Sequence, residues 1–311
     1  MRMSINETRT VPSGSLADGE QAIQRVIARS AEIGGGISVN RLMPSRQRRM
    51  IGAWCFLDHA GPAVFSPGAG MRVGPHPHIG LQTFTWMIEG EVLHRDSLGN
   101  VQVIRPGQVN LMTAGRGIAH TEESLPGENR LHAAQLWIAL PSKDKDCEPA
   151  FDHHPDLPVW DAQGCRFTLL AGHFEGRSAA AKLYSPLVGI DLFSAQGGVV
   201  ELTLDPAFEY GLLPLAGNVS VNQESFAANE LAYLGSALNR VNLNFSAGSQ
   251  AILLGGTPYG EEIVLWWNFV GHSKSEVAQA QHDWEAGHAR FGQVDGYDGA
   301  RLVAPALPWP G

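Results

Sequence analysis

Short apolar runs separated by turn-forming residues dominate the first half of the chain. Between about residues 37 and 140, these runs alternate with clusters of Gly, Pro, Asn or Asp, as in LQTFTWMIEG, VQVIRPGQVN and LHAAQLWIAL. Apolar runs of this kind, bounded by turn formers, are typical of antiparallel strands joined by tight turns. The pattern therefore predicts a β-domain over residues 37–145.

A second strand-rich stretch begins at about residue 166 and contains segments such as GGVVELTLD, ANELAYLG and QAILLGG. The residues before it are polar and rich in proline, which predicts a connector over residues 146–165. Both stretches place glycines at similar points around their strands, and this faint repeat indicates one architecture used twice. We therefore expect a second domain over residues 166–311.

Helical patterns are confined to the two ends of the chain. Residues 1–36 form an N-terminal extension, in which residues 17–33 carry apolar positions at helical spacing and predict a short helical turn. Near the other end, Ser273 and Glu276 have the S-x-x-E spacing of a capping box, which predicts a helix over about residues 274–290. The prolines of the final segment RLVAPALPWPG exclude a regular helix there.

Composition narrows the class of protein. The 311 residues are long enough for two cored β-domains, and 36 glycines and 19 prolines suit many turns. The net charge of −9 disfavours a direct nucleic-acid partner. Three widely spaced cysteines disfavour a disulfide framework. Since no apolar run is long enough to span a membrane and the N-terminus has no apolar signal core, we expect a cytoplasmic protein without a membrane partner.

Two short motifs carry metal-binding chemistry. Residues two apart on a strand share a face, so His76 and His78 can point together into one barrel. His120 and Glu122 form a second such pair, and strand parity turns the neighbouring Glu123 away. Three imidazoles and one carboxylate suit Fe(II), and also Mn, Ni, Cu or Zn. The combination of the two pairs predicts a metal site in the first domain.

The other histidines are assigned different roles. His59, His94 and His132 are expected to be hydrogen-bonded pocket-wall or surface residues rather than ligands. His153 and His154 fall in the polar connector and are expected to be solvent-exposed. Between residues 173 and 272 there is no further histidine and no cysteine, so composition excludes a second imidazole-based site in the second domain.

These motifs resemble those of a known family. The run from Gly70 to His78 resembles the first cupin motif, and HPHIGLQTFTWMIEGEVLHRDSLGN followed by PGQVNLMTAGRGIAHTEE is similar to the pirin family. The resemblance covers about residues 37–291. It implies an all-β bicupin of two stacked antiparallel β-barrels of the jelly-roll type, with iron in the N-terminal barrel. The ligands it implies are the four residues proposed above, His76, His78, His120 and Glu122.

The sequence departs from the usual pirin pattern just after these ligands. The common form is HPHRGFET, whereas this chain has HPHIGLQT, so Ile79 replaces an Arg and Gln82 replaces a Glu. A neutral Gln82 removes a potential acid near the metal, and no general base is assigned. Gln82, Phe84 and Trp86 follow the ligands and are candidates for an aromatic pocket wall, although the two aromatic residues fit a barrel core equally well.

Three functions are compatible with this pattern. The resemblance favours an Fe(II)-dependent dioxygenase that acts on a small aromatic substrate, a flavonol such as quercetin. The alternative is a non-enzymatic metal- or redox-responsive regulator that binds a protein partner. A third is a structural bicupin that retains the metal for stability. Access from solvent to the metal separates the enzyme from the other two.

Overall fold

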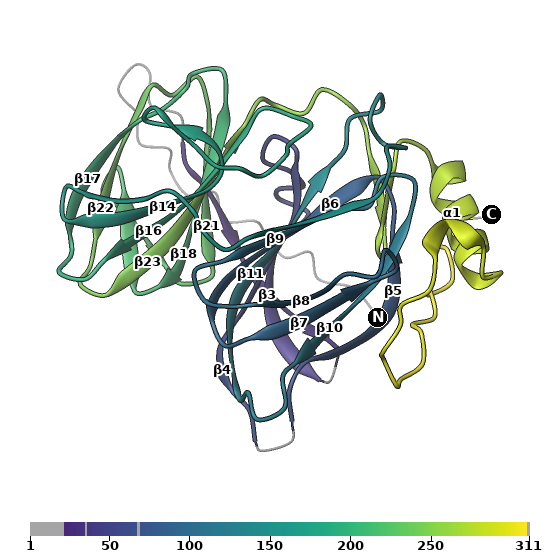
Figure 1. Ribbon diagram of the computed structural model, residues 1–311. Coiled ribbons are helices and arrows are strands. Elements are labelled where there is room, and N and C mark those ends of the chain that lie inside the picture. Colours follow the sequence, from purple (N-terminus) through teal and green to yellow (C-terminus); the bar gives the residue numbers. More distant parts are fainter. Residues whose placement is uncertain (1–21, 35, 67–68, 310–311) are drawn as a thin grey trace, which may run out of the picture.

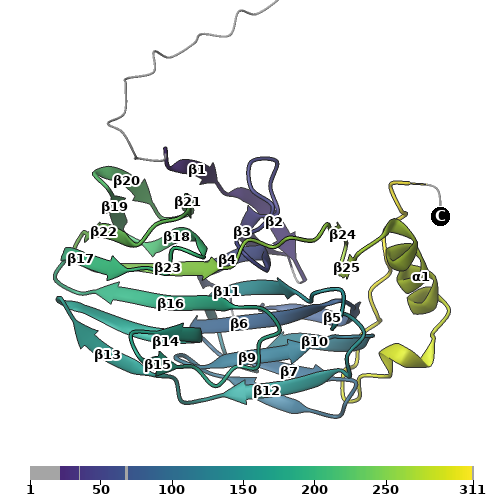
Figure 2. The same ribbon diagram turned by 90° about the horizontal axis from the view of Figure 1, so that it is seen from above.

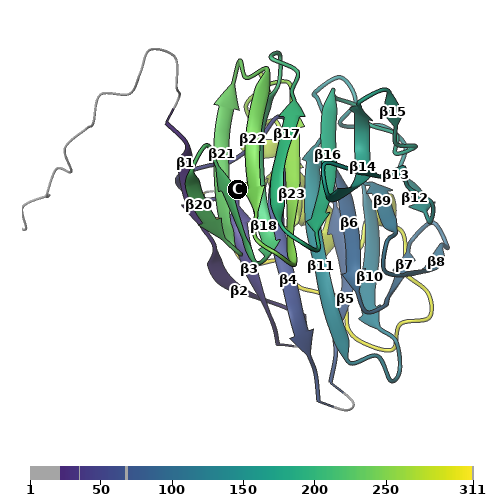
Figure 3. The same cartoon turned by 90° about the vertical axis from the view of Figure 1, so that its left-hand side faces the viewer.

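The structure, a computed structural model, describes residues 22–34, 36–66 and 69–309. Most elements in this part of the chain are β-strands, which form two domains (Figure 1). In each domain a large sheet faces a sheet of four strands, and the two large sheets pack against each other, so that the strands lie in layers (Figure 3). The predicted all-β, two-domain fold is confirmed, but the sheets face each other as jelly rolls and do not close into barrels.

The N-terminal domain pairs a seven-stranded sheet with a four-stranded one. The order of the larger sheet is β12 (Ala150–His154), β9 (Val109–Thr113), β6 (Leu81–Glu89), β11 (Arg130–Ala139), β4 (Trp54–Val64), β3 (Ile37–Met43) and β2 (Arg29–Ile33). The order of the smaller sheet is β5 (Arg72–His78), β10 (Ile118–Ser124), β7 (Val92–Asp96) and β8 (Val101–Ile104).

The C-terminal domain repeats this arrangement. Its larger sheet runs β1 (Gln24–Ile27), β21 (Glu230–Ser236), β18 (Glu209–Ala216), β23 (Ser249–Gly256), β16 (Leu187–Ser194), β14 (Cys165–Phe174) and β13 (Val159–Ala162), and β15 (Arg177–Ser178) pairs with β14. Its smaller sheet runs β17 (Gly198–Thr203), β22 (Arg240–Phe245), β19 (Asn218–Val221) and β20 (Glu224–Ala227).

The helical turn predicted over residues 17–33 is wrong for the part that the structure describes. Residues 17–21, like the polar start of the chain, lie outside the described residues. Residues 24–33 instead form β1, which pairs with β21 of the C-terminal domain, and β2, which pairs with β3 of the N-terminal domain. Val26 is fully buried in the core between the domains. Tertiary pairing therefore overrides the local helical spacing.

The segment in which a connector was predicted contains strands of both domains. β12 pairs with β9 in the N-terminal domain, and β13 pairs with β14 in the C-terminal domain. The predicted solvent exposure of His153 and His154 is wrong, because both residues lie on β12 and are half-buried. Pairing with β9 covers one edge of β12 and draws these side chains partly out of solvent.

The chain ends in a hairpin, a helix and an extended tail. The hairpin consists of β24 (Val264–Trp266) and β25 (Phe269–Gly271). The N-cap half of the capping box is confirmed, because the Ser273 hydroxyl accepts the Glu276 N–H at 3.2 Å, whereas the Glu276 carboxylate accepts from the His272 N–H at 2.9 Å. The helix α1 spans Lys274–Glu285 and ends before residue 290, where a 3₁₀ turn, Ala289–Phe291, follows Gly287 in a left-handed conformation. Among the described residues, no helix is long and apolar enough to span a membrane.

Strand β6 illustrates how the layers are held together. Phe84 and Trp86 on one face enter the core between the domains with Leu213 and Ile252, whereas Met87 on the other face packs inside the N-terminal domain. The strand is therefore buried on both faces, and every residue from Leu81 to Met87 is buried. This double burial bears directly on which β6 side chains can reach the metal site.

Candidate metal centre

Three histidines converge inside the N-terminal domain. The neighbouring strands β5 and β10 place His76 directly opposite His120, and His78 opposite Ile118. One ring nitrogen from each of the three histidines lies within 4.8 Å of the others, and all three residues are buried. The His78 and His120 Nε2 atoms are 3.1 Å apart. Among the described residues, this is the one group of three or more His, Cys, Asp or Glu side chains that could hold a metal ion.

Backbone carbonyls fix the orientation of two of these rings. The Nδ1 of His76 lies 2.9 Å from the carbonyl oxygen of Gly74, and the Nδ1 of His78 lies 2.9 Å from that of Asn268. Because a carbonyl oxygen only accepts hydrogen bonds, each Nδ1 carries the proton and donates it. The Nε2 of both rings therefore presents a lone pair, which is the form that binds a metal.

A hydrogen-bonded chain fixes the third ring. His94 on β7 contacts the Asp96 carboxylate through Nε2 at 3.1 Å, and its Nδ1 lies 3.4 Å from Nδ1 of His120. If His94 donates to the carboxylate, its Nδ1 accepts from His120, and the His120 Nε2 is left as a lone pair. Carboxylate–histidine chains of this kind orient metal ligands in many sites. The expected role of His94 as a hydrogen-bonded wall residue is confirmed.

Burial keeps the three imidazoles uncharged. It lowers the pKa of His76 to about 4, with the neighbouring His94 adding to the effect and the bond to Gly74 opposing it. Burial, followed by the neighbouring histidines, also lowers the pKa values of His78 and His120 well below the ordinary value. Neutral imidazoles can donate their lone pairs to a cation. The donor set therefore fits a divalent transition metal.

The fourth expected ligand lies beside this group but outside its closest set. Glu122 stands opposite His94 in the β10–β7 register, so both side chains point to the inner face. Burial raises the pKa of its carboxyl group to about 7, although the residue as a whole keeps some exposed surface. It does not join the three histidines within 4.8 Å of one another. Glu123 points to the outer face as expected, where Arg95 contacts it at 3.4 Å.

Comparison with known proteins identifies the family. The Pirin family model matches residues 36–138, which contain the histidine cluster, and the model of the pirin C-terminal cupin domain matches residues 190–292. The chain belongs to the pirin family.

Relatives of this pirin cover nearly its whole length. A Pseudomonas aeruginosa protein, named provisionally as a quercetin 2,3-dioxygenase, is 68% identical over 308 residues, which are 99% of this chain and 96% of the relative. A pirin-like protein of Caulobacter vibrioides is 37% identical over 269 residues, covering 84% and 92%. The crystal structure of a quercetin 2,3-dioxygenase from Acinetobacter baumannii has 50% sequence identity and a TM-score of 0.90, covering 92% and 96% of the two chains.

The predicted pocket wall of this pirin lies elsewhere. Gln82, Phe84 and Trp86 share the face of β6 that points to the C-terminal domain, and the Gln82 side-chain amide donates to the Lys182 carbonyl at 3.0 Å. The Trp86 ring N–H donates to Asp191 of that domain at 3.3 Å. None of the three side chains therefore faces the histidines, and the pocket-wall prediction is corrected. The core reading of the two aromatic residues holds.

The wall that does face the histidines comes from the inner face of the larger sheet. Trp137 on β11 lies 5.2 Å from the His78 ring, measured between centroids, and stacks on Phe56 at 4.1 Å. Phe151 of β12 stacks on His94 at 4.3 Å. These aromatic side chains were not predicted, because nothing in the strand sequences marks which face meets the metal.

A row of polar side chains crosses the sheet next to these aromatic residues. Its members are cross-strand neighbours in the registers of β3, β4, β11, β6, β9 and β12: Arg41, Asp58, Gln135, Thr85, Asn110 and His153. The Arg41–Asp58 ion pair at 2.6 Å offsets the burial that raises the pKa of Asp58. Thr85 donates to Gln135 at 2.7 Å. Gln135, which with His132 is one of two polar residues in the run LHAAQLWIAL, was the one sequence signal of this row.

The remaining histidines with a predicted role are also hydrogen-bonded. The Nε2 of His59 lies 2.9 Å from that of His132, and its Nδ1 lies 2.6 Å from the Asn229 side-chain oxygen of the C-terminal domain. Both residues are buried. They therefore belong to the contact between the domains and not to the metal centre.

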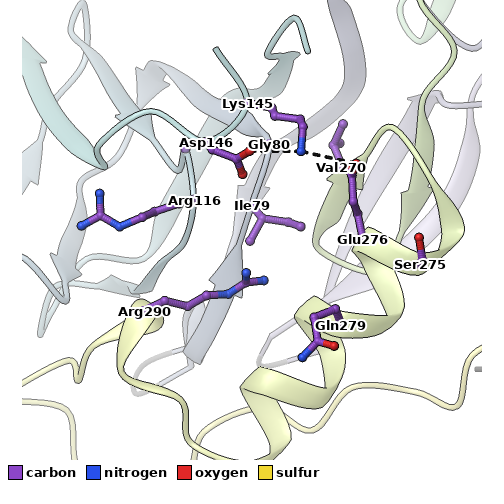
Figure 4. A pocket seen from close by; sticks show the side chains of 11 residues that line it. Ile79, Gly80, Arg116, Lys145, Asp146, Val270, Ser275, Glu276, Gln279 and Arg290 are labelled. Carbon is purple, nitrogen blue, oxygen red and sulfur yellow. Dashed lines mark ion pairs between the residues drawn. The ribbon is translucent and has the colours of Figure 1, made fainter. Parts of the chain in front are cut away.

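A hollow of about 350 Å³ lies outside the metal centre, between the N-terminal domain and α1 (Figure 4). Ile79 forms part of its wall, and the Arg290 side chain reaches into the space beside it. Lys145 contacts Asp146 at 3.1 Å and Glu276 at 3.3 Å across the hollow. None of the three clustered histidines lines it. It is a junction between helix and domain rather than part of the metal site.

Proposed function

We propose that this pirin binds one divalent transition metal ion, Fe(II) in the cell, through His76, His78, His120 and Glu122, and acts as a dioxygenase on a flavonol such as quercetin. The observation that carries the proposal is the convergence of three buried imidazoles, each with one ring nitrogen within 4.8 Å of those of the others. Iron is the family's metal by resemblance, and Mn, Ni, Cu or Zn would fit the same donors. The names of the Pseudomonas and Acinetobacter relatives support the choice of substrate.

The residues around the histidines divide the work. A bound metal would act as a Lewis acid that lowers the pKa of a substrate hydroxyl and offers a place for dioxygen. Trp137 and Phe56 supply an apolar surface against which an aromatic ring can lie. Thr85 and Gln135 offer hydrogen-bonding groups to the hydroxyls of the substrate. Asp96 and His94 hold the His120 ring in its metal-binding tautomer.

Oxygen consumption tests the enzymatic proposal. Wild-type protein is loaded with Fe(II) under anaerobic conditions and then exposed to dioxygen. It should consume dioxygen only after quercetin is added. His78→Ala should lose this activity because a ligand is missing. His173→Ala, which changes an exposed histidine of the C-terminal domain, should retain it. Iron-loaded wild-type protein that consumes no oxygen with quercetin or a panel of other flavonols would reject the activity while leaving the metal site intact.

The burial of the site favours a second candidate function. The three histidines are 6%, 1% and 1% exposed, which leaves little ring surface for a substrate to reach without movement of the surrounding wall. A site of this kind also suits a regulator whose metal state alters a surface that a protein partner recognises. Two results together would favour this regulator over the enzyme. The metal would bind without changing the affinity of the protein for flavonols, and the hydrogen exchange of its surface would differ between the metal-bound and metal-free forms.

A further inference from the structure

Strand β5, which carries two of the proposed metal ligands, is an edge strand of its sheet. It pairs with β10 on one side only, so its other side would present unpaired backbone groups. Two pieces of the C-terminal segment cover that open side, which lies beside the helix and tail in Figures 1 and 2. The Val270 N–H donates to the Ile79 carbonyl at 3.2 Å just beyond the strand, and the Leu302 N–H donates to the Pro75 carbonyl at 2.8 Å.

The same segment reaches the groups that orient the histidines. The carbonyl that accepts from the His78 ring belongs to Asn268, in the turn between β24 and β25. The carbonyl that accepts from the His76 ring belongs to Gly74, and a Cβ at this glycine would lie 2.6 Å from the Ala300 carbonyl oxygen. The tail therefore packs directly against the backbone that holds His76, at a distance that only glycine permits.

The tail is fastened on its other side to α1. The Trp284 ring N–H donates to the carbonyl of Leu302 at 2.9 Å, so that this residue bonds the helix through its C=O and β5 through its N–H. Gln281 likewise donates to the Pro305 carbonyl at 2.9 Å. These contacts hold the tail as a bridge between the helix and the metal-binding strand.

The helix is in turn fixed to the N-terminal domain. Lys145, in the loop before β12, forms the 3.3 Å ion pair with Glu276 in the first turn of α1 (Figure 4). In addition, Val277 and Trp284 of the helix share an apolar cluster with Ile79, the residue after His78. The bridge from domain to helix to tail to β5 is therefore continuous.

We propose that residues 268–302 act as a positioning clamp for the metal centre. This inference rests on the metal site proposed above and extends it to a segment that follows β23, the last strand of the sheets of both domains in the sequence. The clamp keeps β5 in place and supplies the hydrogen bond to the His78 ring, so the ligands are ordered before a metal arrives. Loss of partners that orient metal ligands typically weakens metal binding about 10- to 100-fold, and we expect loss of the clamp to fall in this range.

A proline scan of the tail tests the clamp. Leu302→Pro removes the N–H that bonds Pro75, and Ni(II) affinity, measured by competition with a chelator, should fall about 10- to 100-fold. Leu302→Ala keeps the N–H and should restore wild-type affinity. Val303→Pro is the matched control, because this residue is 83% exposed and its N–H bonds none of the described residues.

Two further measurements separate positioning from general instability. The Co(II)-loaded Leu302→Pro protein should show an altered d–d absorption spectrum while its metal-free melting temperature stays close to that of Val303→Pro. If Leu302→Pro does not fold, Trp284→Phe removes the ring N–H that bonds the Leu302 carbonyl but keeps an aromatic side chain, and should weaken Ni(II) binding by about two- to tenfold.

The outcomes distinguish the two proposals. If wild-type protein binds Ni(II) no better than His78→Ala, the metal site itself is wrong and the clamp has no role. If wild-type binding depends on His78 but Leu302→Pro, or Trp284→Phe in its place, binds with wild-type affinity and spectrum, the clamp alone is overturned. Equal weakening in Leu302→Pro and Val303→Pro would also overturn it, because the effect would then come from proline rather than from the lost hydrogen bond.

Discussion

The four-stranded sheets of the two domains have the same strand arrangement, but their inward-facing side chains are polar in one and apolar in the other. In the N-terminal domain, His120 of β10 stands between His76 of β5 and Asp96 of β7. In the C-terminal domain, the corresponding strands β22, β17 and β19 place Leu243 between two valines, Val200 and Val221.

The remaining interior of the C-terminal domain follows the same rule. Its core is a single cluster of buried apolar residues that includes Phe167, Ile190 and Phe226. Such an interior gains stability from close packing, and among its described residues there is no group of three or more metal-ligating side chains. The jelly roll is therefore a neutral frame, and the side chains at a few inward positions of the smaller sheet decide whether a domain has a metal centre or only a core.

The largest expected effect on metal affinity comes from replacing a proposed ligand of the N-terminal domain by the residue that occupies the corresponding position in the C-terminal domain. His120→Leu introduces the side chain that Leu243 has at the corresponding position, and it removes one of four proposed ligands. Metal affinity should fall by more than the roughly 10- to 100-fold that loss of an outer partner costs. The metal-to-protein ratio after dialysis, measured by elemental analysis, checks this. Full occupancy in His120→Leu would mean that the histidine cluster is not the metal site.

The pH dependence of metal binding tests the role of Glu122. The pKa of His76 is lowered to about 4 and those of His78 and His120 are also well below normal, so protons on these rings do not compete with the metal at mild pH. The Glu122 carboxyl, with its pKa raised to about 7, holds a proton below that pH. A metal that binds Glu122 must displace this proton, so affinity should fall as the pH falls.

The expected slope is about tenfold per pH unit between roughly pH 7 and pH 5, with one proton released per metal bound. Isothermal titration calorimetry in buffers of different ionisation enthalpy measures that proton directly. Glu122→Gln should bind more weakly at pH 8 and show a flat profile over the same range. A slope that survives in Glu122→Gln would assign the proton to another group and remove Glu122 from the ligand set.

A smaller effect on metal affinity is expected from changing Asp96, the carboxylate that contacts His94 and has no counterpart in the C-terminal domain. Asp96→Asn keeps an oxygen for the turn at Leu98 and Asn100 but removes the charge that holds His94. Metal affinity should fall by about tenfold, because His120 loses its preferred tautomer. Asp152→Asn, at an exposed position of β12, is the control. Metal affinity is measured by chelator competition. Equal affinities of the two variants would mean that the hydrogen-bonded chain from Asp96 through His94 to His120 does not influence metal binding.

The smallest effect on the metal is expected on the other face of β6. Gln82→Glu should leave metal affinity and any quercetin turnover within about twofold of wild type, because the side chain points to the C-terminal domain. It should lower the free energy of unfolding by about 1–3 kcal/mol, since a buried donor to Thr113 and Lys182 is lost. A marked change in metal affinity without loss of stability, measured by chelator competition and chemical denaturation, would place Gln82 near the metal after all.

These predictions rest on a site of which sequence reasoning found the centre but not the walls. The i, i+2 spacing of His76 and His78 determined that both share a face, and the structure brings them together with His120. The same parity could not tell which face of β6 meets the histidines. Because β6 is buried on both faces, Phe84 and Trp86 look identical in sequence to inward residues, and only the position of the second domain decides between them.

The errors at the ends of the chain have a related cause. The helical spacing near Val26 is a local signal, whereas β1 is stabilised by strand β21, which lies about 200 residues away in the sequence. The N-cap at Ser273 was predictable because its hydrogen-bonding partner, the Glu276 N–H, is local. The contact of Leu302 with Pro75 joins distant residues through backbone atoms, and no side-chain pattern encodes it.

The covering of β5 by the end of the chain also has a consequence for synthesis on the ribosome. The histidine motifs are complete once residue 122 has been translated, but Asn268 and Leu302 are made only after β23, the last strand of the sheets of both domains. Throughout that interval the histidine strand keeps an open edge, which is a point of risk for pairing with another chain. The hydrogen bonds that the C-terminal segment gives to this strand and to the His78 ring can therefore form only long after the strand itself has been made.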